Sequence, residues 1–359
     1  MGKGPMHKSI ATSTILEHEL SELRLLVERQ SGVILDCPNS ALATHVAEFI
    51  EAQELDSPAT LLERLRSPEQ ESSILPSLLD GLVSGTTGFF RHSGALNALS
   101  RQVLPLLCAR KSADTPGPIR IWSAGCATGE ETYSIAMAVC DAVNPVNLSA
   151  AISGPGNGAA KSSRNGGVAE NSPAGQPGAK LNSGCSIHIV GSDLLPGNIA
   201  VADRGVYRQS ALEGLPPAMI RSYFSKIGTP AAAPVCEEAD SAANSVHGQA
   251  GSQSPAVTAH LLVKPRLRSL VTFNCMNLAR PGYIGRFDCI FCMDVLPHFS
   301  RVQRLAVLER LHLYLEPGGY LFLSQTEKLA ASNLNFRSET FDGYTFHRKP
   351  LAASAAYGR

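Results

Sequence analysis

Two adjacent carboxylates, those of Glu130 and Glu131, follow a turn of small residues in the stretch 119–134, IRIWSAGCATGEETYS. The apolar run before the turn is typical of a β-strand, and the run after it, YSIAMAVCDAV, is typical of a helix. Gly125 and Gly129 can adopt positive φ, so the backbone can approach a flat ligand closely. Negative charge at the mouth of the turn disfavours a phosphate and favours a ribose, whose hydroxyls donate, or a ligand that carries a cation. The spacing is not that of G-x-G-x-x-G, so a dinucleotide site is disfavoured, and an ordinary connection without a ligand is an equal alternative.

Arg91 follows two phenylalanines in the stretch 84–96, SGTTGFFRHSGAL. Because Phe89 and Phe90 favour burial and an arginine needs a partner, we expect the aromatic pair to anchor Arg91 so that it points into a cleft between two domains. An arginine that caps a helix or pairs with a surface acid is the alternative. If it points into the cleft, Arg91 supplies the cation of a binding site.

A further acidic residue, Asp193, ends another strand-like run, IHIVGSD. An acid at the tip of a second parallel strand is where nucleotide-binding folds hold ribose hydroxyls. A structural cap on the helix that begins at Pro196 explains the same residue equally well. The sequence therefore predicts either a ribose ligand or a helix cap at Asp193.

The elements that must position these residues fall into two groups. Residues 14–84 carry leucine, isoleucine and valine at helical spacing, broken by glycine and proline, which predicts a small all-α domain at 1–84. From residue 119, strand-like and helix-like segments alternate, which predicts an α/β domain at 85–350 with a doubly wound, mostly parallel sheet and an antiparallel strand at its edge. The strand-like runs are IRIWSA, IHIVGSD, AHLLVKP, SLVTFNCMNL, FDCIFCMDVL, GYLFLSQTE and FDGYTFHRK. Residues 153–184 and 228–258 are rich in Gly, Ala, Ser and Pro, so we expect two flexible insertions there.

Composition excludes several classes of protein. Among 359 residues, 31 basic and 31 acidic side chains balance, which gives no reason to expect a nucleic-acid partner. No run of eighteen apolar residues and no signal peptide are visible, so we expect no membrane insertion and a cytoplasmic protein. Cys289 and Cys292 have C-x-x-C spacing inside a strand-like run, where they would point to opposite faces. We therefore expect no metal site and reduced thiols.

Five blocks of sequence, in their order and spacing, resemble the chemotaxis-receptor methyltransferases, the CheR family. They are GTTGFFR, WSAGCATGEETYSIAM, GSDLLPGNIAVADRGVY, NLARPGYIGRFDCIFCMDVLPHF and LEPGGYLFLSQTE. The resemblance spans roughly residues 15–347 apart from the two insertions. It implies a small helical N-terminal domain joined to a Rossmann-like methyltransferase domain. The implied reaction transfers the methyl group of S-adenosyl-L-methionine to glutamate carboxylates of a protein substrate, the cytoplasmic helical bundle of a receptor.

Positions matched by the resemblance imply individual roles. Asp193 would hold the ribose, Asn277 and Leu278 would flank the adenine, and Asp294 and Val295 would lie beside the methionine part. The full set of implied cofactor contacts is Thr87, Arg91, Gly125, Glu131, Asp193, Asn277, Leu278, Asp294 and Val295.

Arg91 and His298 are the expected catalytic residues. A glutamate carboxylate is ionised near neutral pH, so no general base is needed, and the enzyme must align the carboxylate with the methyl group and exclude water. A planar guanidinium can bind a carboxylate at two points, which suits Arg91 to that task. His298 stands where the family usually has a tyrosine thought to help orient the methyl site; its imidazole can donate equally, or it is a plain loop residue.

Other departures from the family pattern concern the cofactor and the acceptor. Gly85 replaces a usual asparagine, and Asp294 replaces another, which adds a charge that can still hold the cofactor's ammonium group. The run 40–55, SALATHVAEFIEAQEL, has three glutamates and no lysine or arginine where the family has an arginine-rich helix, and like charges would repel an acidic receptor. We also expect the family's small β-subdomain to be replaced by the 228–258 insertion. The alternatives are a methyltransferase for another acceptor and a cofactor-binding regulatory module with weakened turnover.

Overall fold

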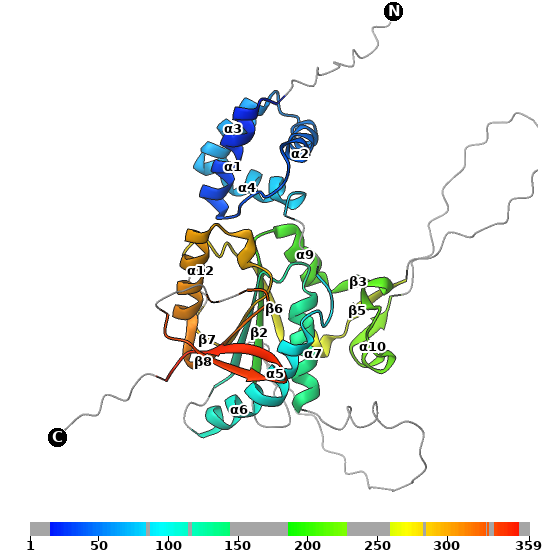
Figure 1. Cartoon of the computed structure of the whole chain (residues 1–359). Helices are drawn as coiled ribbons and strands as arrows, with labels where there is room; N and C mark the ends of the chain where they lie inside the picture. The colour runs from blue at the N-terminus through cyan, green and yellow to red at the C-terminus, as the bar shows by residue number, and fades with distance from the viewer. Residues whose placement is uncertain are drawn as a thin grey trace, which may run out of the picture.

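The computed structural model describes residues 15–83, 87–113, 117–143, 186–227, 259–282, 285–327, 329 and 334–351. Figure 1 shows the helical N-terminal region at the top and the sheet below it. The insertions expected at 153–184 and 228–258, and Gly85, lie outside the described residues.

A seven-stranded sheet forms the centre of the larger part of the molecule, in the order β6-β2-β1-β7-β8-β10-β9. Its strands are β1 (Ile119–Ala124), β2 (Ile187–Asp193), β6 (Val271–Cys275), β7 (Phe287–Cys292), β8 (Leu315–Leu323), β9 (Arg337–Phe341) and β10 (Tyr344–Arg348). The first five strands in this order pair in parallel, and the far edge is antiparallel, as the sequence predicts. This edge has two strands, however, because the run FDGYTFHRK, expected as one strand, contains the turn between β9 and β10. Strand β1 pairs with both β2 and β7, so the chain order reverses on its two sides. In open α/β sheets, ligands bind at the carboxyl ends of the strands at such a switch point.

Helices cover both faces of this sheet. One face packs against α5 (Ser93–Ala98), η1 (Leu99–Val103), α6 (Leu104–Ala113) and α7 (Glu130–Val143), and the other against α12 (Arg301–Tyr314). Alternation along the strands separates the two cores, since Ile121 and Cys289 belong to the first and Trp122 and Cys292 to the second. The two cysteines thus face opposite sides of β7, as their spacing predicts. Within the described residues, no helix has the length and apolar character to cross a membrane.

Four helices, α1 (Glu17–Ser31), α2 (Asn39–Ala52), α3 (Pro58–Arg66) and α4 (Pro68–Asp80), make up the N-terminal region. Local signals set their ends: Gly32, at φ +78°, ends α1, and the Ser57 hydroxyl accepts the N–H of Thr60 at 3.2 Å to begin α3. The helices bury a core of their own, which includes Leu20, Leu23, Val27, Leu42, Val46, Phe49, Leu61, Leu65 and Leu78. The predicted helical character of this region is therefore present.

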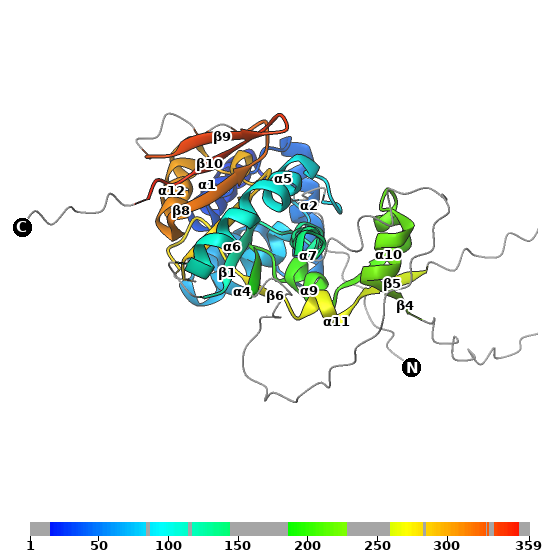
Figure 2. The same cartoon turned by 90° about the horizontal axis from the view of Figure 1, so that it is seen from below.

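A second, antiparallel sheet of three strands stands to one side of the central sheet, beyond α7 and α9 (Pro196–Arg204), with α10 (Pro217–Tyr223) beside it (Figure 2). Its strands are β3 (Val206–Arg208), β4 (Phe224–Lys226) and β5 (His260–Val263).

Two expectations from the sequence were wrong about this small sheet. The run AHLLVKP supplies β5 of this sheet and no strand of the central one, and the small β-subdomain is present beside the 228–258 insertion. The reason is long-range pairing, because Leu262 aligns with both Val206 and Ser225.

Candidate active site

A cavity of about 320 Å³ opens at the carboxyl ends of β1, β2 and β7. Val33 and Val83 from the helical N-terminal region close part of its wall. All ten residues expected at the site line this cavity: Thr87, Arg91, Gly125, Glu131, Asp193, Asn277, Leu278, Asp294, Val295 and His298. Their individual roles stay predictions, but residues distant in sequence meet around one hollow.

The glycine turn brings backbone, without side chain, to the cavity wall. Gly125 has φ +82°, and a Cβ at this position would overlap the Cγ2 methyl of Val295. The N–H groups of Gly125 and Cys126 both donate to the carbonyl of Ser192 at 2.8 Å, which ties the turn to the end of β2. A side chain at residue 125 would therefore collide with Val295 and disturb this part of the cavity wall.

Asp193 braces the same turn from β2. Its Oδ2 accepts the N–H of Ala127 at 2.9 Å, and Ala127 has the unfavourable φ of +47°. Its Oδ1 accepts from Leu195 N–H at 2.9 Å and from the Asn198 amide at 3.0 Å, at the start of α9. The structural role that was an alternative is therefore present. Because a carboxylate offers about four acceptor positions, these three bonds leave room for a donor from the cavity.

The two adjacent glutamates divide their tasks. Glu130 is buried and accepts the Thr128 hydroxyl at 2.7 Å, and the Thr87 side chain also hydrogen-bonds to it, so Glu130 stabilises the turn. Glu131 lines the cavity and accepts the hydroxyl of Ser123 at 2.7 Å. Burial raises the pKa of Glu131 to about 7, opposed by the Ser123 hydroxyl and supported by nearby acids. Glu131 can thus gain or lose a proton near neutral pH.

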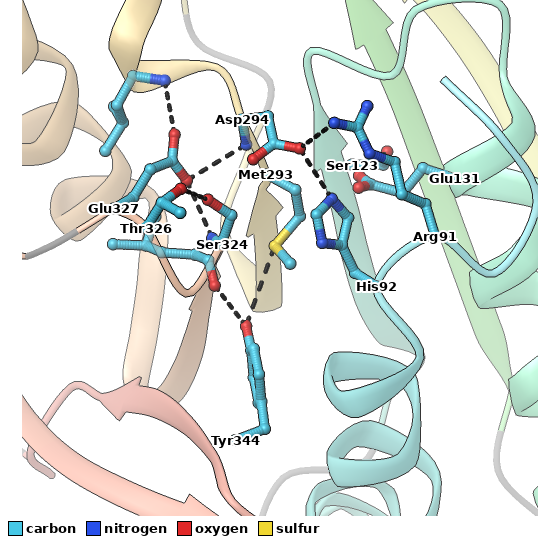
Figure 3. Close-up of polar contacts among 12 residues, drawn as sticks. Arg91, His92, Ser123, Glu131, Met293, Asp294, Ser324, Thr326, Glu327 and Tyr344 are labelled. Atoms are coloured by element: carbon cyan, nitrogen blue, oxygen red, sulfur yellow. Dashed lines mark hydrogen bonds and ion pairs between the residues drawn. The ribbon is translucent and has the colours of Figure 1, made fainter. Parts of the chain in front are cut away.

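Arg91 and His92 share one carboxylate in the cavity wall, near Glu131 (Figure 3). Asp294 Oδ2 lies 3.0 Å from Arg91 Nη2 and 3.1 Å from His92 Nε2. Asp294 adopts a positive φ of +58°, which few residues other than glycine do. Sequence reasoning missed His92, although it directly follows Arg91 in the same block.

The two phenylalanines anchor this arginine as expected. The Phe89 ring meets Tyr207 and Phe224 edge to face, with ring centroids 5.0 and 5.5 Å away. The Phe90 N–H donates to the Ser134 hydroxyl at 2.9 Å. Arg91 is therefore held at the cavity by the two residues that precede it in the sequence.

Asn277 joins the cavity to the N-terminal helices. Its amide donates to the carbonyl of Gln30, in the last turn of α1, at 3.2 Å, and its Oδ1 accepts the N–H of Ala279 at 2.8 Å. Arg280 Nε donates to the same Gln30 carbonyl at 3.0 Å. The side chain expected beside an adenine thus also holds the helical region in place, a role that no sequence signal indicated.

His298 lies in η4 (Leu296–His298), and its half-buried side chain lines the cavity. Its carbonyl accepts the N–H of Ile34 at 2.8 Å, and Val33 forms an isolated bridge with Phe299. Sequence reasoning did not find Val33 as a wall residue, because it lies far from the glycine turn in sequence and belongs to no motif.

Comparison with known families agrees with this geometry. The model of the family described as CheR methyltransferase, SAM binding domain, matches residues 85–154 and 249–344. The chain carries a CheR methyltransferase domain. Chemotaxis protein methyltransferase 1 of Pseudomonas aeruginosa is 26% identical to the chain over 309 residues, which cover 85% of this chain and 88% of the relative. Chemotaxis protein methyltransferase Cher2 of Pseudomonas putida is 25% identical over 315 residues, 87% of this chain and 90% of the relative.

Solved structures of other methyltransferases align more weakly. The magnesium protoporphyrin IX methyltransferase of Synechocystis, crystallised with S-adenosylmethionine, aligns over 80% of this chain and 91% of its own at 14% identity, with a TM-score of 0.25. Similarity at that level adds nothing to what the CheR domain itself indicates.

The CheR domain is a methyltransferase domain, and its cofactor is S-adenosyl-L-methionine. The cavity fits this molecule chemically. The cradle at Gly125 has no space for a Cβ, Glu131 and Asp193 offer carboxylate oxygens that suit ribose hydroxyls, and Asp294 offers a negative charge that suits an ammonium group.

Proposed function

We propose that this chain transfers the methyl group of S-adenosylmethionine to glutamate side chains on the cytoplasmic helical bundle of a chemotaxis receptor. The relatives named chemotaxis protein methyltransferases support this acceptor. One observation supports the class of acceptor more directly: Arg91 and His92 already bind a carboxylate, that of Asp294, at the cavity wall. A glutamate side chain presents the same functional group to the same two side chains.

The cofactor contacts follow from the lining of the cavity. Glu131 and Asp193 would accept the ribose hydroxyls, and Asn277 and Leu278 would flank the adenine. Asp294 and Val295 would lie beside the methionine part, with Thr87 and Arg91 closing the site from the other side. When bound, the cofactor would supply a methyl group on a sulfonium sulfur, whose carbon a carboxylate oxygen can attack directly, with S-adenosylhomocysteine as the leaving group.

The protein's own side chains then need only orient the acceptor and exclude water. The acceptor carboxylate arrives ionised, since its ordinary pKa is about 4.3. Arg91 would orient it by two parallel hydrogen bonds, and His298, at the cavity wall, would help position the methyl site. Val33 and Val83 would keep water away from the reacting groups, which strengthens each of these interactions.

We also propose a helical domain at 1–84, a Rossmann-like methyltransferase domain at 85–350 and a cytoplasmic location.

The charge of helix α2 bears on which part of the acceptor can face it. Helix α2 exposes Glu48 and Glu51 and carries no lysine or arginine. An acidic receptor helix would be repelled there, so the segment of the acceptor that faces α2 should be neutral or basic.

Radiolabelled methyl transfer tests this proposal. The purified chain is incubated with S-adenosylmethionine labelled in its methyl group and with the cytoplasmic fragment of a receptor. We expect label on the fragment that mild base releases as methanol, because glutamyl methyl esters hydrolyse in base. Calorimetry with S-adenosylhomocysteine tests the cofactor separately. Absence of heat at high micromolar ligand would contradict every form of the proposal, whereas binding without transfer would leave a cofactor-binding module.

A further inference from the structure

Glu327 lies just after β8, in the block LSQTE, and no role has been assigned to it so far. Its carboxylate accepts three backbone N–H groups: Ser324 at 2.9 Å and Asp294 at 3.2 Å on Oε2, and Leu296 at 2.9 Å on Oε1 (Figure 3). It therefore joins the segment after β8 to the segment after β7. Glu327 is not among the residues that line the cavity.

The surroundings of this carboxylate show what holds it. Burial raises the pKa of Glu327, and the three backbone donors act in the opposite direction. A carboxylate taken out of water is costly unless hydrogen bonds replace its hydration. Oriented backbone N–H groups supply that replacement here, and in return the carboxylate fixes the positions of the residues that donate to it.

The residues that it fixes are those of the cavity wall. Glu327 binds the N–H groups on either side of Val295, whose methyl group faces Gly125. It also binds the N–H of Asp294, which has φ +58° and directs its side chain to Arg91 and His92. Such a conformation persists only where the surroundings enforce it. One carboxylate behind the cavity wall thus holds both Val295, which faces the glycine turn, and Asp294, which binds Arg91 and His92.

We propose that Glu327 is a positioning residue for methyl transfer, which acts through the Asp294–Leu296 turn on Arg91 and His92. The inference rests on the proposed function, because it assigns a task to those two side chains. Glu327 touches neither the acceptor nor the cofactor in this arrangement.

The test compares Glu327→Gln with the wild-type chain in the full-length protein. The amide keeps the shape of the side chain but turns an NH2 group toward at least one backbone N–H, which loses its acceptor. We expect kcat per S-adenosylhomocysteine-binding site to fall roughly tenfold to a hundredfold, the loss seen when reacting groups are slightly misplaced. In an Arg91→Ala background the same change should reduce kcat little further, since the residue through which it acts is gone.

Controls separate positioning from folding. Glu309→Gln removes an exposed glutamate from α12 and should leave kcat unchanged. A merely structural Glu327 would lower Tm and the number of binding sites but leave kcat per site at the wild-type value, which would overturn the proposal. Glu327→Asp keeps the charge and should lose less activity than the glutamine variant. Failure of both variants to fold would also overturn it, whereas a wild-type chain that binds no S-adenosylhomocysteine would overturn the proposed function instead.

Discussion

The carboxylate of Asp294 lies 3.0 Å from Nη2 of Arg91, so the guanidinium proposed to orient the acceptor is already bound to a carboxylate of its own chain. Both side chains are partly exposed, 43% for Arg91 and 33% for Asp294, so solvent screens the pair and an incoming anion can compete for the arginine. An ammonium group beside Asp294 would weaken its hold on Arg91. Cofactor binding would then prepare the arginine for the acceptor.

Replacement of Arg91 by alanine should separate these roles. We expect kcat/KM for the acceptor to fall roughly a hundredfold, because orientation of the carboxylate is lost. The Kd for S-adenosylhomocysteine should change much less. Steady-state kinetics and calorimetry measure the two quantities. Arg91→Lys is the matched control, since it keeps the charge without the planar pair of donors, and it should recover only part of the rate. Equal losses in rate and cofactor affinity would make Arg91 a cofactor ligand only.

Replacement of Gly125 by alanine should block the cofactor cradle. The left-handed conformation at φ +82° costs an alanine about 1–2 kcal/mol, and its methyl group would meet Val295. We expect affinity for S-adenosylhomocysteine to fall by roughly tenfold or more, measured by calorimetry. Gly282→Ala is the control, because no atom lies within 4 Å of a Cβ at that position. A Gly125→Ala protein with wild-type affinity would show that the ligand does not use the turn.

The pKa of about 7 at Glu131 predicts two effects of pH. Between about pH 4.5 and pH 7 the folded chain holds a proton that the unfolded chain has lost, so this group makes folding stability fall as pH rises through that range and contributes no further change above it. Ribose hydroxyls donate best to the ionised carboxylate. We therefore expect affinity for S-adenosylhomocysteine to rise about tenfold from pH 6 to pH 8, with proton release on binding near pH 7.

Calorimetry in buffers of different ionisation enthalpy measures that proton release. Glu131→Gln removes the titration and should bind with little dependence on pH across the same range. The glutamine variant is needed to assign the effect to this carboxyl group. A slope that persists in Glu131→Gln would assign the pH dependence to another group.

Replacement of Asp193 by alanine tests its two roles together. The variant loses an acceptor for the ribose and also releases the N–H of Ala127, so we expect cofactor binding to weaken by about 1.5–3 kcal/mol. Asn198→Ala removes one of the protein's own bonds to Asp193 and shows how much of the loss follows from that bond and from the contribution of Asn198 to the cavity wall. Isothermal titration measures the loss of cofactor affinity, and thermal melting measures the loss of folding stability. Unchanged affinity in Asp193→Ala would refute the ribose role.

Local patterns predicted the central elements well. The strand at 119–124, the turn at Gly125 and the helix after it were visible because alternation, glycine and helical spacing are local properties. An antiparallel edge was also expected, but from the Pro-Gly-Gly segment 317–319, which lies inside β8, a strand that pairs in parallel with β7; the turn between the two edge strands is at Asp342 and Gly343. The ten site residues could be assembled from a resemblance in five blocks, and they meet in one cavity.

Long-range contacts were not predictable in the same way. Leu262 has the same apolar character as a central strand residue, and only its pairing with Val206 and Ser225 places it in the small sheet. Glu327 lies 33 positions from Asp294 in the chain, and nothing in its neighbourhood indicates that its carboxylate will bind that residue's N–H. The bond from Asn277 to the Gln30 carbonyl spans 247 positions. Such contacts follow from the assembled fold and leave no periodic trace in the sequence.

The carbonyl at the end of α1 has a practical consequence for anyone who shortens this protein. A fragment trimmed to the family-model boundary at residue 85 would discard Gln30, Val33 and Val83 together. The Asn277 amide and the Arg280 guanidinium would then lose the Gln30 carbonyl that both bind, and bulk water would replace one wall of the cavity. The smallest fragment that keeps the cavity whole therefore starts upstream of α1, about seventy residues before residue 85, where the match to the family begins.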